Sequence, residues 1–349
     1  MSALRRIGSP ARKGRVLALV HDHLVPPEDT SGIDVLEAEW KMEYDVIETL
    51  RESGHDVRVL GIHDELAKIR PTANTFDPHI VLNLLEAFAG VTTFDQNVVS
   101  YLELLRLPYT GCNPRGLMLA RDKGLSKKLL AYHRIPVPEF TVVRPGRKAR
   151  LPKRMDFPVI VKSLFFESSA GISQASVVET DEQLQRRVQF IHDNLGTAAI
   201  VERFIDGREL YVGVLGNERL EVLPVWEMSF AQMPENRWRI ATERVKWSTQ
   251  YQKRHGIMTD RATLDASEQD RIQHIARRTY RALDLNGYAR IDLRLDEEGR
   301  AFVIEANPNP NIAYGEDFAE SAEVAGISYE RLLERVIALG RRWKPVRTG

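Results

Sequence analysis

The hydrophobic pattern in the first third of the chain alternates between short apolar runs and segments with helical spacing. Residues 15–20 form an apolar run typical of a buried strand, and apolar residues then recur at helical spacing from Trp40 to Leu50, before Gly54. The same alternation continues with predicted strands at 56–62 and 79–85 and a predicted helix at 98–105. Strands that alternate with helices favour an open parallel sheet of the α/β class.

From residue 113 onward the pattern changes to strands that follow one another with few helices. Asn113 and Pro114 suit the N-cap and first turn of a helix, which we expect to run to about His133. Thr180 and Gln183 form the capping box of another helix, which ends near Gly196. The predicted strands are 139–143, 157–162, 174–178, 198–205, 208–213 and 220–228, with a turn at Asp206 and Gly207 between the fourth and the fifth.

The last third contains a long polar stretch followed by regular elements. Residues 229–263 are polar, rich in Arg, Gln and Trp, and poor in periodicity, which favours a functional loop or lid. After Asp265 we expect a helix at 267–283, a hairpin at 289–306 and a terminal helix at 329–343. The segment 1–14, with four basic residues among Gly, Ser and Pro, is interpreted as a flexible basic arm, and 15–113 as the first domain.

The amino-acid composition limits the kinds of partner that the protein is expected to bind. The 349 residues include 49 Lys and Arg and 49 Asp and Glu, so no net charge selects for nucleic acid or an anionic membrane. The single cysteine, Cys112, excludes an internal disulfide and fits a reducing compartment. No apolar run approaches the ~18 residues that span a bilayer, and the first fourteen residues lack a signal-peptide core. We therefore expect a cytoplasmic protein with small-molecule partners, bound to neither nucleic acid nor membrane.

The common catalytic and phosphate-binding motifs are missing. Gly111 and Gly116 have the glycine spacing of a phosphate-binding loop, but Leu117 and Met118 stand where Lys and Ser or Thr are needed. The dinucleotide, zinc-protease and serine-hydrolase signatures are absent from the chain. These absences direct attention to the C-terminal hairpin.

Charged residues share one face of that hairpin. With Glu297 and Glu298 at its tip, Arg290 would pair with Glu305 and Asp292 with Val303. Arg290, Asp292 and Glu305 then lie on one face, and the apolar residues Ile291, Leu293 and Ile304 on the other. Two carboxylates and the amide of Asn307 supply the oxygen ligands that Mg²⁺ prefers. A surface salt bridge across the strands is the alternative interpretation.

Several motifs together point to a known family. They are Pro108-Tyr-Thr-Gly111, Arg121-Asp-Lys123, Phe157-Pro-Val-Ile-Val-Lys162, Glu167-Ser-Ser-Ala-Gly171, Val201-Glu202 followed by Glu209, Arg290-Ile-Asp292 and Glu305-Ala-Asn307. In these motifs, over roughly residues 80–340, the chain resembles the ATP-grasp superfamily and its D-alanine–D-alanine ligase-like branch. The resemblance implies an N-terminal α/β domain followed by two α+β subdomains, 114–205 and 206–349, with ATP between them. It also implies ligation of a carboxylate to an amine through an acyl phosphate, and homodimers are common in such a family.

The resemblance also implies roles for individual residues. Lys123 and Lys162 would contact ATP phosphates, and a lysine in a strand that otherwise reads Val-Ile-Val is itself unusual without an anion. Lys246 would reach the site from a mobile loop, and Arg290 would stabilise the oxyanion of the tetrahedral intermediate. The other nucleotide-binding candidates are Glu167, Ser168, Ser169 and Gly171 in a phosphate loop, Glu202, Arg203, Phe204 and Ile205 along the adenine, Glu209 at the ribose, and Ile304. Asp292, Glu305 and Asn307 would hold Mg²⁺, for which Mn²⁺ could substitute.

The departures from the family lie in the expected substrate pockets. The first loop reads His21-Asp-His-Leu-Val-Pro-Pro-Glu-Asp29, without the family's ammonium-binding glutamate, for which Glu28 or Asp29 are the candidates. Residues 313–318 do not match the serine-containing segment that receives the second D-alanine. We therefore expect a ligase with a different acid, a different amine, or both. The alternatives are a D-alanine–D-alanine ligase proper, a nucleotide-binding regulatory or interaction protein with this fold, and a small-molecule kinase.

Overall fold

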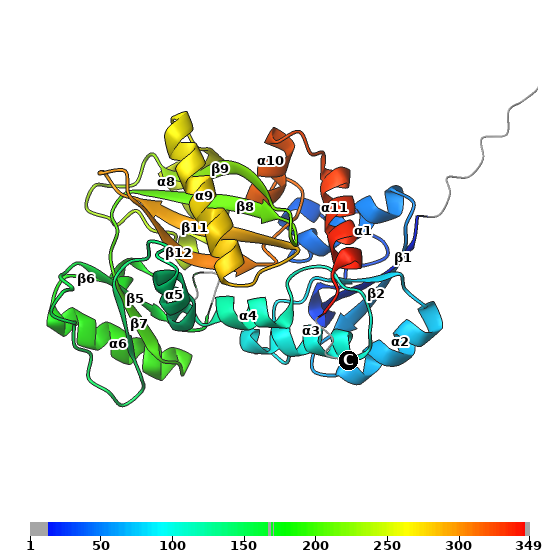
Figure 1. Ribbon diagram of the computed structural model, residues 1–349, viewed down its shortest axis with the longest axis horizontal. Coiled ribbons are helices and arrows are strands. Elements are labelled where there is room, and N and C mark those ends of the chain that lie inside the picture. The colour runs from blue at the N-terminus through cyan, green and yellow to red at the C-terminus, as the bar shows by residue number, and fades with distance from the viewer. Residues whose placement is uncertain (1–12, 167–168, 170, 346–349) are drawn as a thin grey trace, which may run out of the picture.

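The computed structural model describes residues 13–166, 169 and 171–345, and their strands form three sheets (Figure 1). A three-stranded sheet occupies one half of the molecule, and a four-stranded and a five-stranded sheet share the other half. The N-terminal part is thus α/β and the remainder α+β, as the hydrophobic pattern predicts.

The N-terminal sheet is parallel, with strand β1 (Arg15–His21) between β2 (Asp56–Ile62) and β3 (Ile80–Asn83). Its helices are α1 (Lys41–Glu52), α2 (Ile69–Phe76) and α3 (Asp95–Leu104), with the short 3-10 helices η1 (Asp22–Leu24), η2 (Val35–Glu37), η3 (Leu66–Lys68) and η4 (Thr92–Phe94) between strands and helices. All the predicted strands and helices of this region are confirmed, whereas α2 was not predicted.

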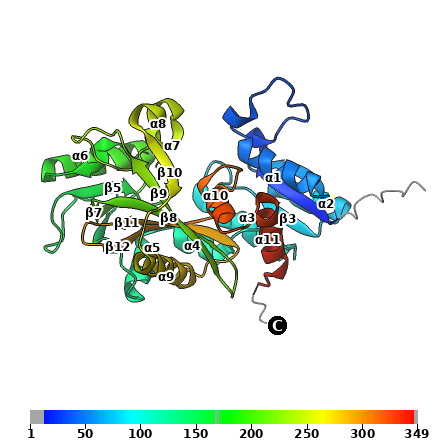
Figure 2. The same cartoon turned by 90° about the horizontal axis from the view of Figure 1, so that it is seen from above.

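Alternate residues of β1 pack into two separate cores, as the two-residue period of a strand requires. Leu17 and Leu19 belong to the core that includes the buried residues of α2 and α3. Val16 and Ala18 belong to the core formed with α1 and with the C-terminal helix α11 (Tyr329–Arg342). The predicted terminal helix therefore returns to the N-terminal sheet, where it contacts α1 and β3 (Figure 2).

The helix predicted from Pro114 to about His133 is two helices, α4 (Pro114–Arg121) and α5 (Lys123–Tyr132). The break falls at Asp122, whose backbone is extended and whose side chain accepts a hydrogen bond from the amide of Leu125 at 2.8 Å. A side chain that caps a new helix competes with continuation of the previous one. The break puts Lys123 in the first turn of α5, beside the second half of the molecule.

The four-stranded sheet is antiparallel, in the order β4–β7–β5–β6, and is covered on one face by a single helix. Its elements are β4 (Phe140–Val143), β5 (Val159–Ser163), η5 (Gln174–Ser176), β6 (Val177–Val178), α6 (Asp181–Leu195) and β7 (Ala199–Arg203). Thr180 caps α6 as predicted. Val159 and Val161 pack in the core with α6, so the alternate residues Ile160 and Lys162 lie on the opposite face.

The five-stranded sheet is also antiparallel, in the order β10–β9–β8–β11–β12. Its elements are β8 (Arg208–Leu215), β9 (Glu221–Phe230), α7 (Glu243–Trp247), α8 (Thr249–His255), β10 (Ile257–Arg261), α9 (Ala266–Ala282), β11 (Tyr288–Leu295), β12 (Ala301–Pro308) and α10 (Asp317–Val324). The prediction of an irregular stretch at 229–263 was wrong over its second half, which holds α7, α8 and β10. α10 was also not predicted.

The turn at Asp206 and Gly207 does not close a hairpin, because β7 and β8 belong to different sheets. It carries the chain from the four-stranded to the five-stranded sheet. Gly207 has φ +141° there, and a Cβ atom would lie 2.1 Å from the carbonyl oxygen of Leu295. Only glycine fits such a close approach of two backbones.

The hairpin of β11 and β12 forms, but its predicted register was wrong by two residues. Arg290 pairs with Asn307, and Asp292 pairs with Glu305. One residue of the error lies at the turn, and the other is a bulge at Ile304, which has no partner between Val303 and Glu305. Because the side-chain period of a strand is two, the errors compensate, and the acidic residues share one face as predicted.

Candidate active site

A pocket lies between the four-stranded and the five-stranded sheets, and we call it the inter-sheet pocket. It has about 800 Å³ of empty space including its mouth, within the ~300–1,000 Å³ of small-molecule sites. Ten of the predicted nucleotide-binding residues line it, namely Lys123, Lys162, Ser169, Glu202, Arg203, Phe204, Ile205, Glu209, Lys246 and Ile304. Gly171 is not among the lining residues, and Glu167 and Ser168 lie outside the described residues.

One end of the inter-sheet pocket is apolar. Ile160, Phe204 and Ile240 are buried side chains of one cluster, and Ile172 packs against it. The ring of Trp238 meets that of Phe204 edge to face, with centroids 5.1 Å apart. Sequence reasoning identified only Phe204 here, because isolated apolar residues on different segments carry no signal that they share a wall.

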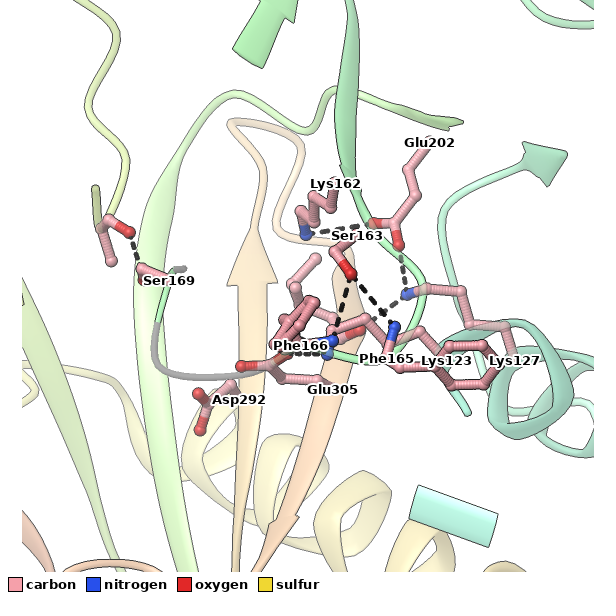
Figure 3. Close-up of polar contacts among 12 residues, drawn as sticks. Lys123, Lys127, Lys162, Ser163, Phe165, Phe166, Ser169, Glu202, Asp292 and Glu305 are labelled. Atoms are coloured by element: carbon pink, nitrogen blue, oxygen red, sulfur yellow. Dashed lines mark hydrogen bonds and ion pairs between the residues drawn. The ribbon is translucent and has the colours of Figure 1, made fainter. Parts of the chain in front are cut away.

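The other end holds lysines and carboxylates (Figure 3). Lys123 donates to the carbonyl oxygen of Phe166 at 2.9 Å and lies 3.5 Å from Glu305. Lys162 is 3.3 Å from Glu202. Burial lowers the pKa of Lys123, which Glu305 opposes. Burial also opposes ionisation of Glu305, but Lys123, Lys246 and Lys162 outweigh it and lower its pKa to about 2.

A further buried lysine, Lys127, was missed by the sequence analysis. It lies one turn beyond Lys123 on α5 and donates to the carbonyl oxygen of Ile304, the bulge residue of β12, at 2.7 Å. It is also 3.4 Å from the second carboxylate oxygen of Glu202. Burial lowers the pKa of Lys127 to about 8, while Glu202 opposes the shift. The signal was its spacing of four from Lys123, which puts both lysines on one helix face.

Glu209 is held by two neighbours. Its carboxylate accepts from the hydroxyl of Tyr211 at 2.9 Å and from Arg294 at 2.7 Å. Arg294 also donates to the carbonyl oxygen of Gly207 at 3.1 Å, so it ties the turn between the two sheets to the pocket. Arg294 was not among the predicted site residues.

Two loops meet over the inter-sheet pocket. The hydroxyl of Ser169 donates to the carbonyl oxygen of Ala241 at 2.6 Å, and Ser169 has the left-handed φ of 60°. The side chain of Gln174 exchanges two hydrogen bonds with the backbone of Trp238, at 2.8 and 3.0 Å. The carbonyl oxygen of Gly171 accepts from Arg187. Lys246 follows on α7 and lines the pocket from the same segment, as a lid would.

The charged face of the hairpin lies where two pockets meet. Asp292 accepts two hydrogen bonds from Arg290, at 2.8 and 2.9 Å. Asp292 and Glu305 line the inter-sheet pocket, whereas Arg290 and Asn307 line a second pocket, and Lys246 lines both. Burial raises the pKa of Asp292, an effect that Arg290 opposes and Glu305 strengthens. We call these four hairpin residues the junction residues.

The second pocket lies between the N-terminal domain and the five-stranded sheet. Carboxylates line it on both sides, contributed by Glu39, Glu43, Glu86, Glu316 and Asp317. Cationic side chains reach it from Arg121, Lys246 and Arg290. We call it the acidic pocket. Of its residues, sequence reasoning had identified only Lys246, Arg290 and Asn307, because the others come from segments far apart in the chain.

Comparisons with known proteins identify the family. A family model described as the D-ala D-ala ligase C-terminus matches residues 129–338. A D-alanine–D-alanine ligase of Desulforudis audaxviator is 30% identical over 300 residues, which cover 85% of each chain. The chain belongs to the D-alanine–D-alanine ligase family.

Two further proteins are similar to this chain over most of its length. The uncharacterized protein y4sG of Sinorhizobium fredii is 32% identical over 306 residues, covering 85% of this chain and 86% of that protein. The crystal structure of D-alanine–D-alanine ligase from Bacillus anthracis complexed with ATP has a TM-score of 0.73 at 20% identity, covering 94% of this chain and 98% of that one. The ATP-grasp fold implied by the motifs is therefore confirmed, and the chain is an ATP-dependent ligase that forms C–N bonds.

The junction residues of this ligase-family chain suit a hard divalent cation. Asp292 and Glu305 face each other across adjacent strands, and Asn307, opposite Arg290 in the same hairpin, would offer its amide oxygen. No group of three or more His, Cys, Asp or Glu within the described residues is arranged to hold a metal. Two carboxylates and an amide therefore leave the other ligand positions to water and phosphate, which is typical of Mg²⁺.

Across residues 13–166, 169 and 171–345, no helix combines the length and the apolar character that crossing a bilayer requires.

Proposed function

We propose that this chain ligates an acid held in the acidic pocket to an amine, using ATP held in the inter-sheet pocket. The junction residues carry the proposal, because they form one continuous charged face that lines both pockets. A γ-phosphate at that face would lie within reach of a carboxylate from the other side. The enzyme class follows from the family, whereas the placement of substrates is our inference.

ATP would lie with its adenine against the apolar end of the inter-sheet pocket and its phosphates at the lysine end. Phe204 and Ile240 offer apolar surface to the base, and Glu209 is an acceptor for ribose hydroxyls. Lys123 and Lys162 would pair with phosphate oxygens in place of their present carboxylate and carbonyl partners. The loop contact between Ser169 and Ala241 would help to exclude water from the phosphates.

Asp292, Glu305 and Asn307 would hold Mg²⁺, for which Mn²⁺ could substitute. When bound, it supplies positive charge that neutralises the phosphate oxygens during transfer. Arg290, which donates twice to Asp292, would orient that carboxylate and favour its ionised form.

The reaction has two group transfers. A carboxylate oxygen of the acid attacks the γ-phosphorus, the bond from that phosphorus to the bridging oxygen breaks, and ADP leaves. The amine nitrogen then attacks the acyl carbon, the bond to the phosphate oxygen breaks, and phosphate leaves with its electron pair while the nitrogen loses one proton. Arg290 would donate to the oxygen that becomes negative in the tetrahedral intermediate, and Lys246 on the lid would close over the phosphates.

A hydroxamate assay tests this proposal without knowledge of the natural amine. Hydroxylamine traps acyl phosphates, so the protein is incubated with ATP, Mg²⁺, hydroxylamine and one acid at a time, over amino acids and short peptides. We expect hydroxamate and ADP in equal amounts with at least one acid. ATP binding without ADP release would instead favour a nucleotide-binding regulatory protein, and a stable phosphorylated product would favour a kinase.

The same assay separates the possible ligases. If D-alanine alone forms the hydroxamate and a second D-alanine replaces hydroxylamine, the chain is a D-alanine–D-alanine ligase proper. The homodimer implied by the family resemblance stays a prediction, and light scattering of the purified protein would test it.

A further inference from the structure

Tyr211 contacts residues of both pockets. It lies on β8 directly opposite Asp292 of β11, so its side chain is on the face of the sheet that carries the junction residues. It is 2% exposed and lines the acidic pocket. Glu209 lies two residues earlier on the same strand, and therefore on the same face, and lines the inter-sheet pocket. One buried side chain thus stands between the two pockets.

The hydroxyl of Tyr211 fixes one oxygen of Glu209. It donates to Oε1 at 2.9 Å, while Arg294 donates to Oε2 at 2.7 Å. Burial, together with the charges of Glu209 and Asp292, raises the pKa of Tyr211 well above its ordinary value, so the hydroxyl stays protonated and remains a donor. Because each oxygen of Glu209 has its own donor, the carboxylate is held in one orientation, and its remaining lone pairs can accept from a ligand.

The ring of Tyr211 supports Arg290. The guanidinium carbon of Arg290 lies 4.6 Å from the centre of the ring, within the range of a cation–π contact. Asp292 holds one edge of the same guanidinium, through Nε and Nη2. Within the described structure Nη1 makes no hydrogen bond. With an edge and a face both held, the guanidinium keeps one plane and leaves Nη1 free to donate to a substrate oxygen.

Packing sets the position of the ring. Tyr211 belongs to a buried cluster that includes Trp226 and Met228 of β9 and Val245 of α7. Val245 precedes the lid residue Lys246, so the same cluster anchors the lid helix. A ring that is locked by its neighbours supports Arg290 without losing side-chain entropy when a substrate binds.

Packing alone does not account for a tyrosine at this position. A phenylalanine would fill the same space and would leave no buried hydroxyl that needs a partner. The charge of Glu209 is already opposed by Arg294, so the hydroxyl adds orientation to that carboxylate more than it adds charge balance. The two ends of the side chain therefore have separate tasks, one at Glu209 and one at Arg290.

We propose that Tyr211 is a positioning residue for both substrates. Its hydroxyl orients Glu209 toward the ribose of ATP, and its ring holds Arg290 so that Nη1 meets the oxyanion of the tetrahedral intermediate. Tyr211 takes no part in either group transfer. This inference rests on the proposed function, which puts the ribose at Glu209 and the oxyanion at Arg290, and it adds the residue that fixes both groups.

Nucleotides that differ only at the ribose test the hydroxyl. Tyr211→Phe keeps the ring and removes the donor. In the hydroxamate assay with an accepted acid, we expect KM for ATP to rise roughly 3- to 10-fold with kcat little changed. KM for 2′,3′-dideoxy-ATP should stay the same, because this analogue has no ribose hydroxyl to offer Glu209. An equal rise for the two nucleotides, or no rise for either, would overturn the role of the hydroxyl.

The kcat at saturating ATP tests the ring. Tyr211→Leu removes the face that supports Arg290, so we expect kcat for hydroxamate formation to fall roughly 10-fold, whereas Tyr211→Phe should retain it. In an Arg290→Ala background the same leucine substitution should lower kcat no further, because the group that the ring positions is absent. Additive losses would overturn the role of the ring. Tyr211→Met replaces the leucine variant if that variant does not fold.

Trp226→Leu is the matched control. It removes an aromatic ring from the same buried cluster, and Trp226 is not among the residues that line either pocket. We expect a lower temperature of unfolding, with kcat and the KM values for both nucleotides unchanged.

The outcomes separate this inference from the proposed function. Hydroxamate from no acid at all would contradict the proposed function. Equal KM values for ATP and its dideoxy analogue in the natural protein would contradict the ribose at Glu209, and with it the role of the hydroxyl. Hydroxamate formation in which the Tyr211 variants behave like the Trp226 control would uphold the function and contradict the role of Tyr211.

Discussion

The inter-sheet pocket and the acidic pocket share the junction residues but differ in how their charges are balanced. In the inter-sheet pocket each buried carboxylate faces a cation, as Glu202 faces Lys162 and Glu209 faces Arg294. In the acidic pocket Glu43 is buried with no partner in the described residues. In a pocket whose charges are already paired, both the cations and the carboxylates can leave their present partners and bind a ligand such as ATP. The acidic pocket is lined by five carboxylates and three cationic side chains, so the charges that line it do not balance.

The largest expected effect is at Glu305, which we propose as a ligand of the metal. Glu305→Gln removes one ligand charge, so we expect ADP formation to fall by at least ~10²–10³-fold while the fold is retained. Glu297→Gln is the matched control, because Glu297 lies exposed at the tip of the same hairpin. Coupled-enzyme measurement of ADP checks both. Full turnover in the Glu305 variant would remove the basis for the metal assignment.

Arg290→Ala acts on the acidic-pocket side of the same face. We expect a loss of ~2–4 kcal/mol of transition-state stabilisation, because a donor to the developing oxyanion is removed. Arg300→Ala is the control, since Arg300 pairs only with Asp296 and Glu298 near the hairpin tip in the described structure. Unchanged hydroxamate formation would argue against the role.

Lys127→Met tests whether the paired charges of the inter-sheet pocket are structural. The substitution leaves Glu202 buried with Lys162 as its remaining cation and releases the carbonyl oxygen of Ile304. We expect the free energy of unfolding to fall by ~2–4 kcal/mol and KM for ATP to rise. Lys128→Met, at the exposed neighbouring position, should change neither. Denaturant titration of both variants makes the measurement, and a Lys127 variant as stable as the Lys128 control would contradict this interpretation.

The smallest expected effect is on the pH dependence of stability, and it comes from the carboxylate of Glu43. Glu43 has a pKa of about 7 in the fold, against ~4.3 for an unperturbed glutamate, so the folded protein binds this proton more tightly than the unfolded chain. The contribution of this proton to the free energy of unfolding is therefore fully present below pH ~4, and it is lost as the pH rises to 7 and Glu43 ionises. Glutamine cannot ionise, so the Glu43→Gln variant should gain stability relative to the natural protein as the pH rises. We expect the difference in free energy of unfolding between variant and natural protein to be ~1–3 kcal/mol larger at pH 8 than at pH 4.

Thermal unfolding of the two proteins at both pH values measures this double difference, in which the contributions of all other groups cancel. A difference that does not change with pH would mean that Glu43 has the same pKa in the folded and the unfolded chain, and would contradict the effect of its burial.

The sequence predicted the elements and the residues that line the inter-sheet pocket better than the residues that line the acidic pocket. Lys162 stood out because a lysine in an apolar strand needs an anion. The predicted shared face of Asp292 and Glu305 survived a register error, because the turn and the bulge shifted the pairing by one residue each. Both inferences depended on local periodicity, which a sequence displays directly.

The features that the sequence did not predict depend on contacts between segments that are far apart in the chain. Glu43 was not identified from the sequence, although it lies on the buried face of α1 with Val46, Ile47 and Leu50. That it lines the acidic pocket depends on the other segments that form the pocket. The candidates Glu28 and Asp29 are exposed and do not line the acidic pocket. The helix break at Asp122 was missed because an aspartate is tolerated within a helix, and its capping of Leu125 decides the outcome only in the folded chain. The roles of the predicted nucleotide and metal residues stay predictions until they are tested by substitution.

The central claim is that the junction residues pass the γ-phosphate of ATP to the carboxylate of an acid. Turnover of an acid labelled with ¹⁸O in its carboxylate, followed by ³¹P NMR of the released phosphate, tests this transfer directly. The account predicts one ¹⁸O atom from the acid in each phosphate released. Phosphate released without the label would show that the acid is never phosphorylated, and would contradict the account.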